Sequence, residues 1–164
     1  MTKIITLFSF SLFLIWSCSG REEIKDFQAI LDQSKKDATA LMEKHLDAVA
    51  NKDLATLKST LSPDGKMLLM LPSSEIMDGV DKYVEFHEEW FKDTSWTFET
   101  KILNSEVGTQ KGIFITEQIY REPDRDGKPY FNRMAVSYGV EKKGNQWYVI
   151  TDHCTSIEKS TDKK

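Results

Sequence analysis

The spacing of apolar residues changes once along this chain, near Trp96, and this change constrains the fold more than any other feature of the sequence. Before Trp96 the apolar residues recur at steps of three and four, as on one face of a helix. After Trp96 they alternate with polar residues, as on one face of a strand. Helices followed by consecutive strands are typical of an α+β fold, in which the helices gather on one face of the sheet.

The segment before Trp96 is predicted to hold three helices and a short hairpin. Asp53 suits the N-cap of the second helix, because its carboxylate can accept hydrogen bonds from unpaired backbone N–H groups. The sequence Ser62-Pro63-Asp64-Gly65 predicts a turn. The expected elements are helices over 27–50, 54–61 and 80–92 and strands over 66–71 and 74–77.

The segment after Trp96 is predicted to form three or four strands joined by hairpins. A loop rich in Pro, Gly and Asp covers 122–129, a turn covers 143–145, and the last strand covers 147–155. Strands joined by hairpins pair in antiparallel fashion. The sheet must curl around the helices to bury both apolar surfaces, so we expect a cone-shaped, curved antiparallel sheet with a pocket.

The N-terminus carries a short apolar run, from Ile4 to Trp16, behind the basic residue Lys3. The run is shorter than the ~20 apolar residues of a transmembrane helix, and its length and flanks suit a secretory signal. It ends in Leu-Ile-Trp-Ser-Cys at Cys18, which resembles a lipobox, the motif whose cysteine receives a lipid. Trp16 departs from the small or aliphatic residue that is usual at its position.

These features predict four regions in the chain. They are a signal peptide (1–17), a lipid-anchored linker (18–26), one domain (27–157) and a charged, disordered tail (158–164). An uncleaved N-terminal anchor and an ordinary secretory signal with an incidental cysteine stay open as alternatives. All three place the domain outside the cytoplasm, and lipidated Cys18 would hold it in the cell envelope, on the periplasmic or outer-membrane face.

Composition and motifs exclude several classes of function. The net charge is -4 and Lys and Arg form no basic stripe, which disfavours nucleic-acid binding. The three histidines and Cys154 lack metal-ligand spacing, and His87-Glu88 lacks the second histidine of the zinc-protease motif. No glycine-rich phosphate loop or serine nucleophile elbow is present. We therefore expect no metal and no cofactor, and we interpret Cys154 as a small apolar strand residue.

Three segments resemble the nuclear transport factor 2-like superfamily. The first is similar to the junction of that superfamily's first two helices, and the second to the glycine that opens its third helix. The third resembles the Trp-x5-His-x-Ser pattern of its last strand, with Thr155 in place of the serine. These segments are Ala48–Leu54, Asp78–Val80 with Tyr83, and Gly144–Trp147 with His153 and Thr155.

The resemblance spans about Ser34 to Ile157 and implies a cone-shaped domain with a pocket. The superfamily includes SnoaL-like polyketide cyclases, ketosteroid isomerase-like enzymes and the association domain of calcium/calmodulin-dependent kinase. Because it hosts both enzymes and binding modules, the resemblance carries over the fold and the pocket but not catalysis.

Three polar residues on apolar faces are the candidate acid–base groups. Glu117 stands among Ile113, Ile115 and Ile119, where an unpaired carboxylate would be desolvated and its pKa raised. His87 lies on the apolar face of the third helix and could exchange a proton near neutral pH.

The third candidate, His153, stands on the same strand face as Trp147, and on a convex sheet face it would belong to a dimer surface instead. The simpler structural interpretations are that Glu117 forms an ion pair with an arginine and that the histidine is a hydrogen-bonded core residue. Tyr83, Trp90 and Tyr138 are further candidate pocket residues, although aromatic residues at these spacings usually form the core.

The leading hypothesis is a small-molecule-binding module without catalysis, since no acid–base pair stands at a recognisable spacing. The ligand would be hydrophobic or acidic, and Arg121 and Arg133 could pair with an acidic one, although solvated strand edges are their simpler interpretation. One alternative is an isomerase, cyclase or hydratase that uses Glu117, His87 or His153. Another is a partner-binding homodimer that meets through an exposed sheet face.

Overall fold

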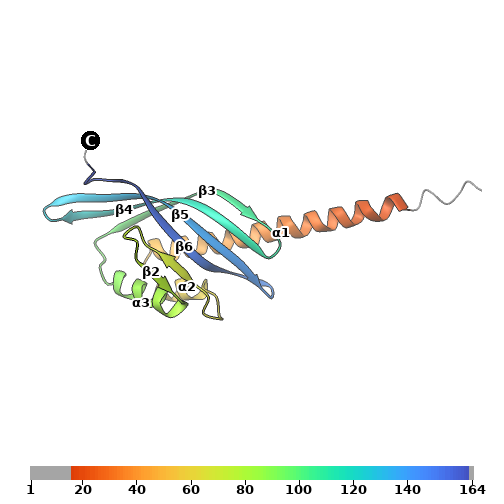
Figure 1. Ribbon diagram of the computed structural model, residues 1–164, viewed down its shortest axis with the longest axis horizontal. Coiled ribbons are helices and arrows are strands. Elements are labelled where there is room, and N and C mark those ends of the chain that lie inside the picture. The colour runs from red at the N-terminus through yellow and green to blue at the C-terminus, as the bar shows by residue number, and fades with distance from the viewer. Residues whose placement is uncertain (1–15, 163–164) are drawn as a thin grey trace, which may run out of the picture.

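The computed structural model describes residues 16–162 of the chain, with side chains from residue 23 onward. Helices come first and long strands follow, as the change of periodicity predicted (Figure 1). The elements are α1 (Trp16–Ala50), α2 (Leu54–Ser59), β1 (Leu68–Met70), β2 (Ile76–Asp78), α3 (Val80–Trp90), β3 (Thr97–Val107), β4 (Lys111–Arg125), β5 (Lys128–Lys143) and β6 (Gln146–Lys159).

The strands form one curved, six-stranded sheet in the order β2-β1-β6-β5-β4-β3. Strands β3 to β6 pair as successive antiparallel neighbours, which confirms the expected hairpins. The short strand β1 joins β6 in parallel, with Leu69 opposite Asp152. Sequence periodicity does not report such a non-local pairing, which brings the β1–β2 hairpin beside the last strand.

Helix α1 lies in the hollow of the sheet and supplies much of the core (Figure 1). Its buried face continues the spacing expected from the sequence and packs against β3 and β6. Because the sheet curls around this face, apolar surface of both elements leaves water together. The buried residues of α1 are Ser34, Ala38, Met42, His45, Leu46, Ala48 and Val49.

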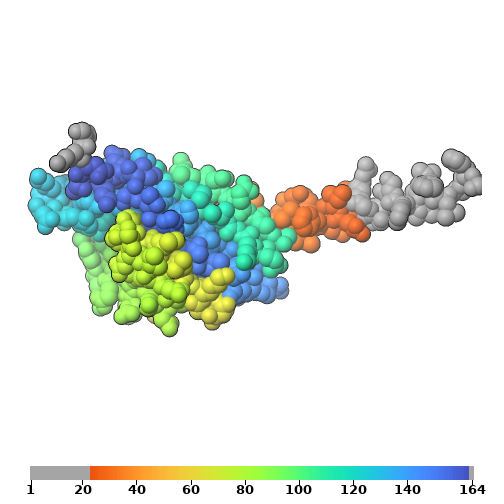
Figure 2. Space-filling model, in the orientation of Figure 1, coloured from red at the N-terminus to blue at the C-terminus, as the bar shows by residue number. Residues whose placement is uncertain are grey.

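The N-terminal part of α1 projects beyond the sheet in Figure 1, and its orange residues stand clear of the rest of the molecule in Figure 2. The helix starts at Trp16 rather than at residue 27, so the predicted linker 18–26 is helical. Residues 1–15 of the predicted signal peptide lie outside the described part of the chain. For Cys18, only the helical backbone is described. Within the described residues, no helix combines the length and apolarity that crossing a membrane requires.

The last strand continues into the segment expected to be a tail from residue 158. Strand β6 continues to Lys159, which pairs with Asn132, and the Ser160 N–H donates to the Phe131 carbonyl at 3.1 Å. The partner strand β5 is long enough to offer hydrogen bonds to these charged residues. Charge composition alone therefore gave the wrong end of the last strand.

Local sequence signals set the starts of the short helices. Asp53 caps α2, since its carboxylate accepts a hydrogen bond from the Thr56 N–H at 2.9 Å. Gly79 precedes α3 with a φ of 99°, a backbone conformation that favours glycine. The Gly65 N–H closes the predicted turn on the Ser62 carbonyl at 3.1 Å.

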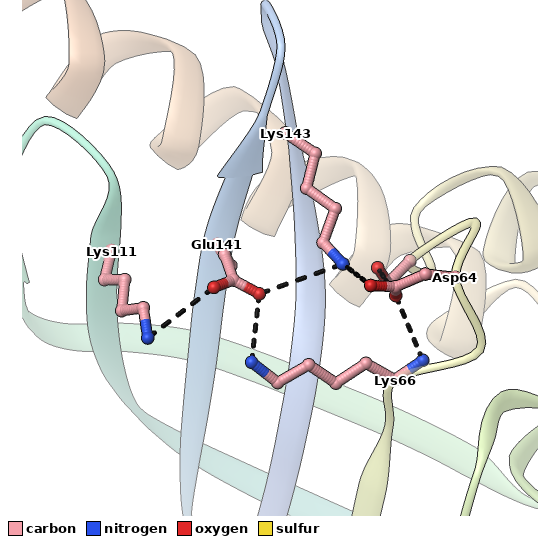
Figure 3. Close-up of polar contacts among 6 residues, drawn as sticks. Asp64, Lys66, Lys111, Glu141 and Lys143 are labelled. Carbon is pink, nitrogen blue, oxygen red and sulfur yellow. Dashed lines mark hydrogen bonds and ion pairs between the residues drawn. The ribbon is translucent and has the colours of Figure 1, made fainter.

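Charged side chains hold the loop before β1 against β5 (Figure 3). Glu141 pairs with Lys66 at 3.0 Å and with Lys111 at 3.5 Å. Lys143 contacts Asp64, and this contact holds the pKa of the Asp64 carboxyl well below its usual value. These pairs are solvent-accessible, so they contribute little to stability individually, but together they position the loop.

A β-bulge in β6 decides which of its side chains face the helices. Gly139 of β5 is opposite Thr151, whereas the next residue, Val140, is opposite Val149, so Ile150 is an extra residue. Trp147 and Val149 are buried before the bulge, and Asp152 is buried after it. The bulge thus reverses the alternation and turns Asp152 toward the helices.

Candidate functional site

A cavity of about 280 Å³ lies between α3 and the inner face of the sheet. Its walls are mostly apolar or aromatic, as in sites that bind small molecules. A few polar side chains interrupt these walls. The aromatic walls are Phe86, Trp90, Phe98 and Tyr120, and the polar groups inside are His87, Gln118, Asn132, Tyr138, Asp152 and Cys154.

Asp152 is the buried acid of this cavity, and only 5% of it is exposed. Its Oδ1 accepts a hydrogen bond from the Cys154 thiol at 3.2 Å, and its Oδ2 lies 3.5 Å from the Tyr83 hydroxyl. Among the described residues no Lys or Arg forms an ion pair with it. Burial therefore raises the pKa of Asp152 to about 7, because an ionised carboxylate is poorly solvated there.

Tyr138 offers a hydroxyl proton beside this carboxyl. Gln118 donates to the Tyr138 oxygen at 2.7 Å, and no described residue accepts the Tyr138 proton. Burial raises the pKa of Tyr138 well above its ordinary value, so the proton stays on the hydroxyl at neutral pH. The cavity thus holds a hydrogen-bond donor in the position that the sequence had suggested for Tyr138.

Asn132 offers an unused acceptor. Its Oδ1 is buried and has no hydrogen-bond partner among the described residues. A buried polar atom without a partner costs free energy, on the order of 1–3 kcal/mol. A ligand that donates a hydrogen bond to Asn132 would recover part of this cost.

His87 lines the cavity as a neutral ring. Its Nδ1–H donates to the Tyr83 carbonyl at 2.8 Å, which leaves Nε2 as an acceptor. Aromatic rings surround it, and burial lowers its pKa to about 4. At neutral pH His87 can accept a hydrogen bond but is a weak base.

The rim of the cavity carries one cation, which is already paired. Arg125 donates to Glu122 at 2.7 Å and stacks on Tyr130, with its guanidinium carbon 3.5 Å from the ring centre. Tyr120 donates to the same Glu122 at 2.6 Å. Among the described residues, the rim therefore presents no unpaired positive charge.

Glu117 lies on the outer face of the sheet, which corrects the expectation that it lines the pocket. Both faces of β4 are apolar: Phe114 is buried inside, whereas Ile113 is 45% exposed outside. Glu117 shares the outer face with Ile113 and accepts a hydrogen bond from Arg133 at 3.0 Å. The same Arg133 also pairs with Glu158, at 3.3 Å.

His153 also lies outside, because the bulge at Ile150 turns Asp152 and Cys154 inward in its place. Of the other candidates, His87, Trp90 and Tyr138 meet at the cavity. Tyr83 is fully buried beneath it and reaches the site through Asp152.

Sequence reasoning missed Asp152, Asn132, Gln118 and Cys154 as cavity residues. The available signal was a glycine, Gly139, in the middle of an otherwise alternating strand, which often marks a bulge or a close approach. A Cβ at Gly139 would lie 2.6 Å from Thr151 Oγ1. Within the described part of the chain, no group of three or more His, Cys, Asp or Glu side chains is placed to hold a metal ion.

Solved structures of the same fold cover most of this chain. The association domain of the calcium/calmodulin-dependent kinase II of C. elegans matches with a TM-score of 0.58 and 20% identity, over 76% of this chain and 97% of that one. A ketosteroid isomerase-like protein from Erwinia carotovora atroseptica matches with a TM-score of 0.63 and 16% identity, over 75% and 95%.

A nuclear transport factor 2-like protein of unknown function from Pseudomonas putida matches with a TM-score of 0.61 and 16% identity, over 78% of this chain and 87% of that one. At these identities the likeness shows the fold alone, and it confirms the expected cone-shaped α+β fold. No protein of curated function matches the chain in sequence. The calcium/calmodulin dependent protein kinase II association domain family matches residues 34–158, and the chain belongs to this family.

Proposed function

We propose that this protein is a cell-envelope lipoprotein, anchored through Cys18, whose cavity binds a small molecule. The ligand has an aromatic or aliphatic body and a head group that donates hydrogen bonds, such as an amine or an alcohol. The observation that carries the proposal is a mostly apolar cavity that holds two polar groups. They are the buried Asp152 carboxyl, which has no ion-pair partner among the described residues, and the unpartnered Asn132 Oδ1.

The charges around the cavity favour such a head group over the acidic ligand that the sequence left open. Arg125 is neutralised by Glu122, and the outward-facing Arg133 is paired with Glu117 and Glu158. An acidic head would therefore meet Asp152 without a compensating cation. An ammonium head would pair with Asp152, and the aromatic walls would stabilise it further.

The test uses phenethylamine, 2-phenylethanol and phenylacetate, which share one body and differ in the head group. A ligand at one hundred times its Kd should raise the melting temperature of the full-length protein by roughly 5–10 °C. We expect the amine and the alcohol to raise it and phenylacetate to leave it unchanged. A shift with phenylacetate alone, or with none of the three, would contradict the proposal.

Two matched variants locate the binding. Asp152→Asn and Glu117→Gln each replace a carboxyl by an amide, on opposite faces of the sheet. Calorimetry should show at least a tenfold loss of amine affinity in Asp152→Asn, about 1.4 kcal/mol, and none in Glu117→Gln. Equal losses in both variants would place the binding elsewhere.

A second candidate function is proton transfer, with Asp152 in the role that the sequence analysis gave to Glu117, His87 or His153. A pKa of about 7 suits a general acid–base group at neutral pH. Its test is the exchange of the α-hydrogens of phenylacetone with deuterated water, followed by NMR. Exchange at the buffer rate in the wild type would exclude this activity for that ketone.

A third candidate is self-association through the outer face of the sheet. Ile113 and Ile157 are 45% and 49% exposed there, and exposed apolar surface of this kind marks interaction sites. The C. elegans relative is named an association domain, which favours assembly of this chain as well. We propose a homodimer, which is independent of what fills the cavity.

A further inference from the structure

A chain of buried polar side chains runs from the end of α2 to the cavity. It begins at Thr60 and passes through His45 and Tyr83, none of which is exposed to solvent. His45 Nδ1 lies 2.7 Å from Thr60 Oγ1, and His45 Nε2 lies 3.1 Å from the Tyr83 hydroxyl. The same hydroxyl lies 3.5 Å from Asp152 Oδ2, so one contact path joins α1, α2, α3 and β6.

The far end of this chain fixes the tautomer of His45. Thr60 donates its only hydroxyl proton to the Leu57 carbonyl, at 2.6 Å. The Thr60 oxygen must then accept from His45, which places the ring proton on Nδ1. Burial lowers the pKa of His45 to about 3, so the ring carries one proton at neutral pH and Nε2 is an acceptor.

The near end of the chain then requires a proton on Asp152. The hydroxyl of Tyr83 has one proton, and the nearer acceptor, His45 Nε2, takes it. With that proton committed, the contact between the Tyr83 oxygen and Asp152 Oδ2 is a hydrogen bond only if the carboxyl donates. The direction of the bonds thus favours neutral Asp152, independently of the cost of burying its charge.

We propose that Thr60, His45 and Tyr83 act as a buried relay that holds Asp152 as a neutral acid and reverses its direction when Asp152 loses its proton. One proton then leaves the Asp152 carboxyl for solvent through the cavity. The ring proton of His45 moves from Nδ1 to Nε2, while Tyr83 and Thr60 each keep one hydroxyl proton. In the reversed state Tyr83 donates to Asp152, His45 Nε2–H donates to Tyr83, and Thr60 donates to Nδ1.

The groups that face Asp152 leave this relay as its main polar connection. Tyr138 approaches from β5 and Cys154 from β6 itself, and burial keeps both protonated by raising their pKa values. His87 stacks on Tyr83, with the ring centres 4.1 Å apart, and burial keeps it neutral. The neighbouring strand β1 pairs through the apolar Leu69.

The relay lets a bound ligand determine whether Asp152 is neutral or ionised, and this consequence rests on the proposed function. A neutral alcohol would bind to neutral Asp152, whereas an ammonium would favour the ionised form and release one proton. Reversal costs the hydrogen bond from Thr60 to the Leu57 carbonyl, so the relay opposes ionisation. Thr60 and His45 would thereby adjust amine affinity without touching the ligand.

The first test reads the tautomer of His45 in the ligand-free, full-length protein. Nitrogen-15 NMR of the imidazole separates the Nδ1–H and Nε2–H forms, and carbon-13 labelling of aspartate reports the titration of Asp152. We expect the Nδ1–H form below the Asp152 midpoint and the Nε2–H form above it. One unchanged tautomer on both sides of the midpoint would overturn the relay.

The second test alters the far end of the relay. Thr60→Val removes the oxygen that keeps the ring proton of His45 on Nδ1. This should lower the titration midpoint of Asp152 by about one pH unit, which corresponds to the free energy of one hydrogen bond. Thr60→Ser should restore it, and Thr116→Val, which removes a buried hydroxyl outside the relay, should leave it unchanged. In a Tyr83→Phe background, Thr60→Val should have no effect on the midpoint.

An unchanged midpoint in Thr60→Val, or the same shift with and without Tyr83, would overturn the inference. The tautomer test needs no variant, so it stands even if a substitution impairs folding. Neither measurement uses a ligand. A failed relay is thus distinguishable from a failed binding proposal.

Discussion

At the scale of one residue, Asp152 is the main acid–base group of the cavity. It is buried in the cavity, accepts from Cys154 and lies against Tyr83. Its folded pKa of about 7 exceeds the ordinary 3.8. Between these two values the folded state holds a proton that the unfolded chain has lost, so stability falls as pH rises through this window and levels off above it.

Asp152→Asn should therefore gain stability relative to the wild type as the pH rises. An amide mimics the neutral acid, since its nitrogen can donate to Tyr83 and its oxygen can accept from Cys154. From pH 5 to pH 8 the difference in unfolding free energy should grow in favour of the variant by about 3 kcal/mol. Urea unfolding at the two pH values measures this difference.

The comparison with the wild type removes the contributions of His45 and His87, which oppose that of Asp152. Burial lowers their pKa values to about 3 and about 4, so both favour the folded state more as pH rises toward 6.5. Both histidines are present in the variant. A difference that is equal at pH 5 and pH 8 would mean that Asp152 is ionised throughout.

At the scale of one element, the bulge in β6 determines the site. Gly139 and Thr151 lie opposite each other, and the Gly139 N–H donates to Thr151 Oγ1 at 2.9 Å. The absent side chain of Gly139 makes room for the threonine. This close approach keeps Ile150 as the extra residue and Asp152 on the inner face.

Gly139→Ala should destabilise the fold, because the new Cβ would lie 2.6 Å from Thr151 Oγ1. We expect a loss of about 1–3 kcal/mol in unfolding free energy, as for other overpacked positions. Adding Thr151→Ala removes the clashing oxygen and should restore part of the loss. Strictly additive effects of the two substitutions would show that the clash is not the cause.

The same element shows how far the sequence predicts the molecule. Periodicity gave the three helices and the long antiparallel strands, because each of them buries one face. It assigned Glu117 to the wrong face, since Ile113 and Phe114 make both sides of β4 apolar. It missed Asp152 because a bulge reverses the alternation, and the pairing at Gly139 depends on a distant strand.

Periodicity also placed the start of the first helix too late, at residue 27 instead of Trp16. Residues 23–30 of this helix are all exposed, so no tertiary contact marks them in the sequence. Of the three relay residues, only Tyr83 was singled out from the sequence. His45 lies on the apolar face of a helix, where its spacing does not distinguish it from a core residue. Its partner Thr60 stands on another helix end, and only the folded chain brings the two together.

The whole molecule has two surfaces with different properties. The inner face of the sheet lines the cavity, whereas the outer face is free of helices (Figure 1). The outer face carries Ile113, Ile157 and the exposed His153. His153 would belong to the proposed dimer surface, because it lies on this outer face. Binding and assembly can thus be altered separately.

The proposed dimer should dissociate when a charge is placed on the outer face. Ile113→Asp buries a carboxylate in the interface, so sedimentation velocity should show half the mass of the wild type. Ile30→Asp is the matched control, because Ile30 is 53% exposed on α1, outside the sheet. A wild type that sediments as a monomer, or a dimer that Ile113→Asp leaves intact, would exclude this interface.

The projecting part of α1 has a consequence for reach. A flexible linker would allow many distances between the domain and the membrane surface, whereas a continuous helix is a strut of fixed length. From Cys18 to Ile30 this strut extends roughly 18 Å, at 1.5 Å per residue. With a lipid on Cys18, it would set a stand-off height for the cavity, so ligands would be captured from one depth of the surrounding space rather than from the surface itself.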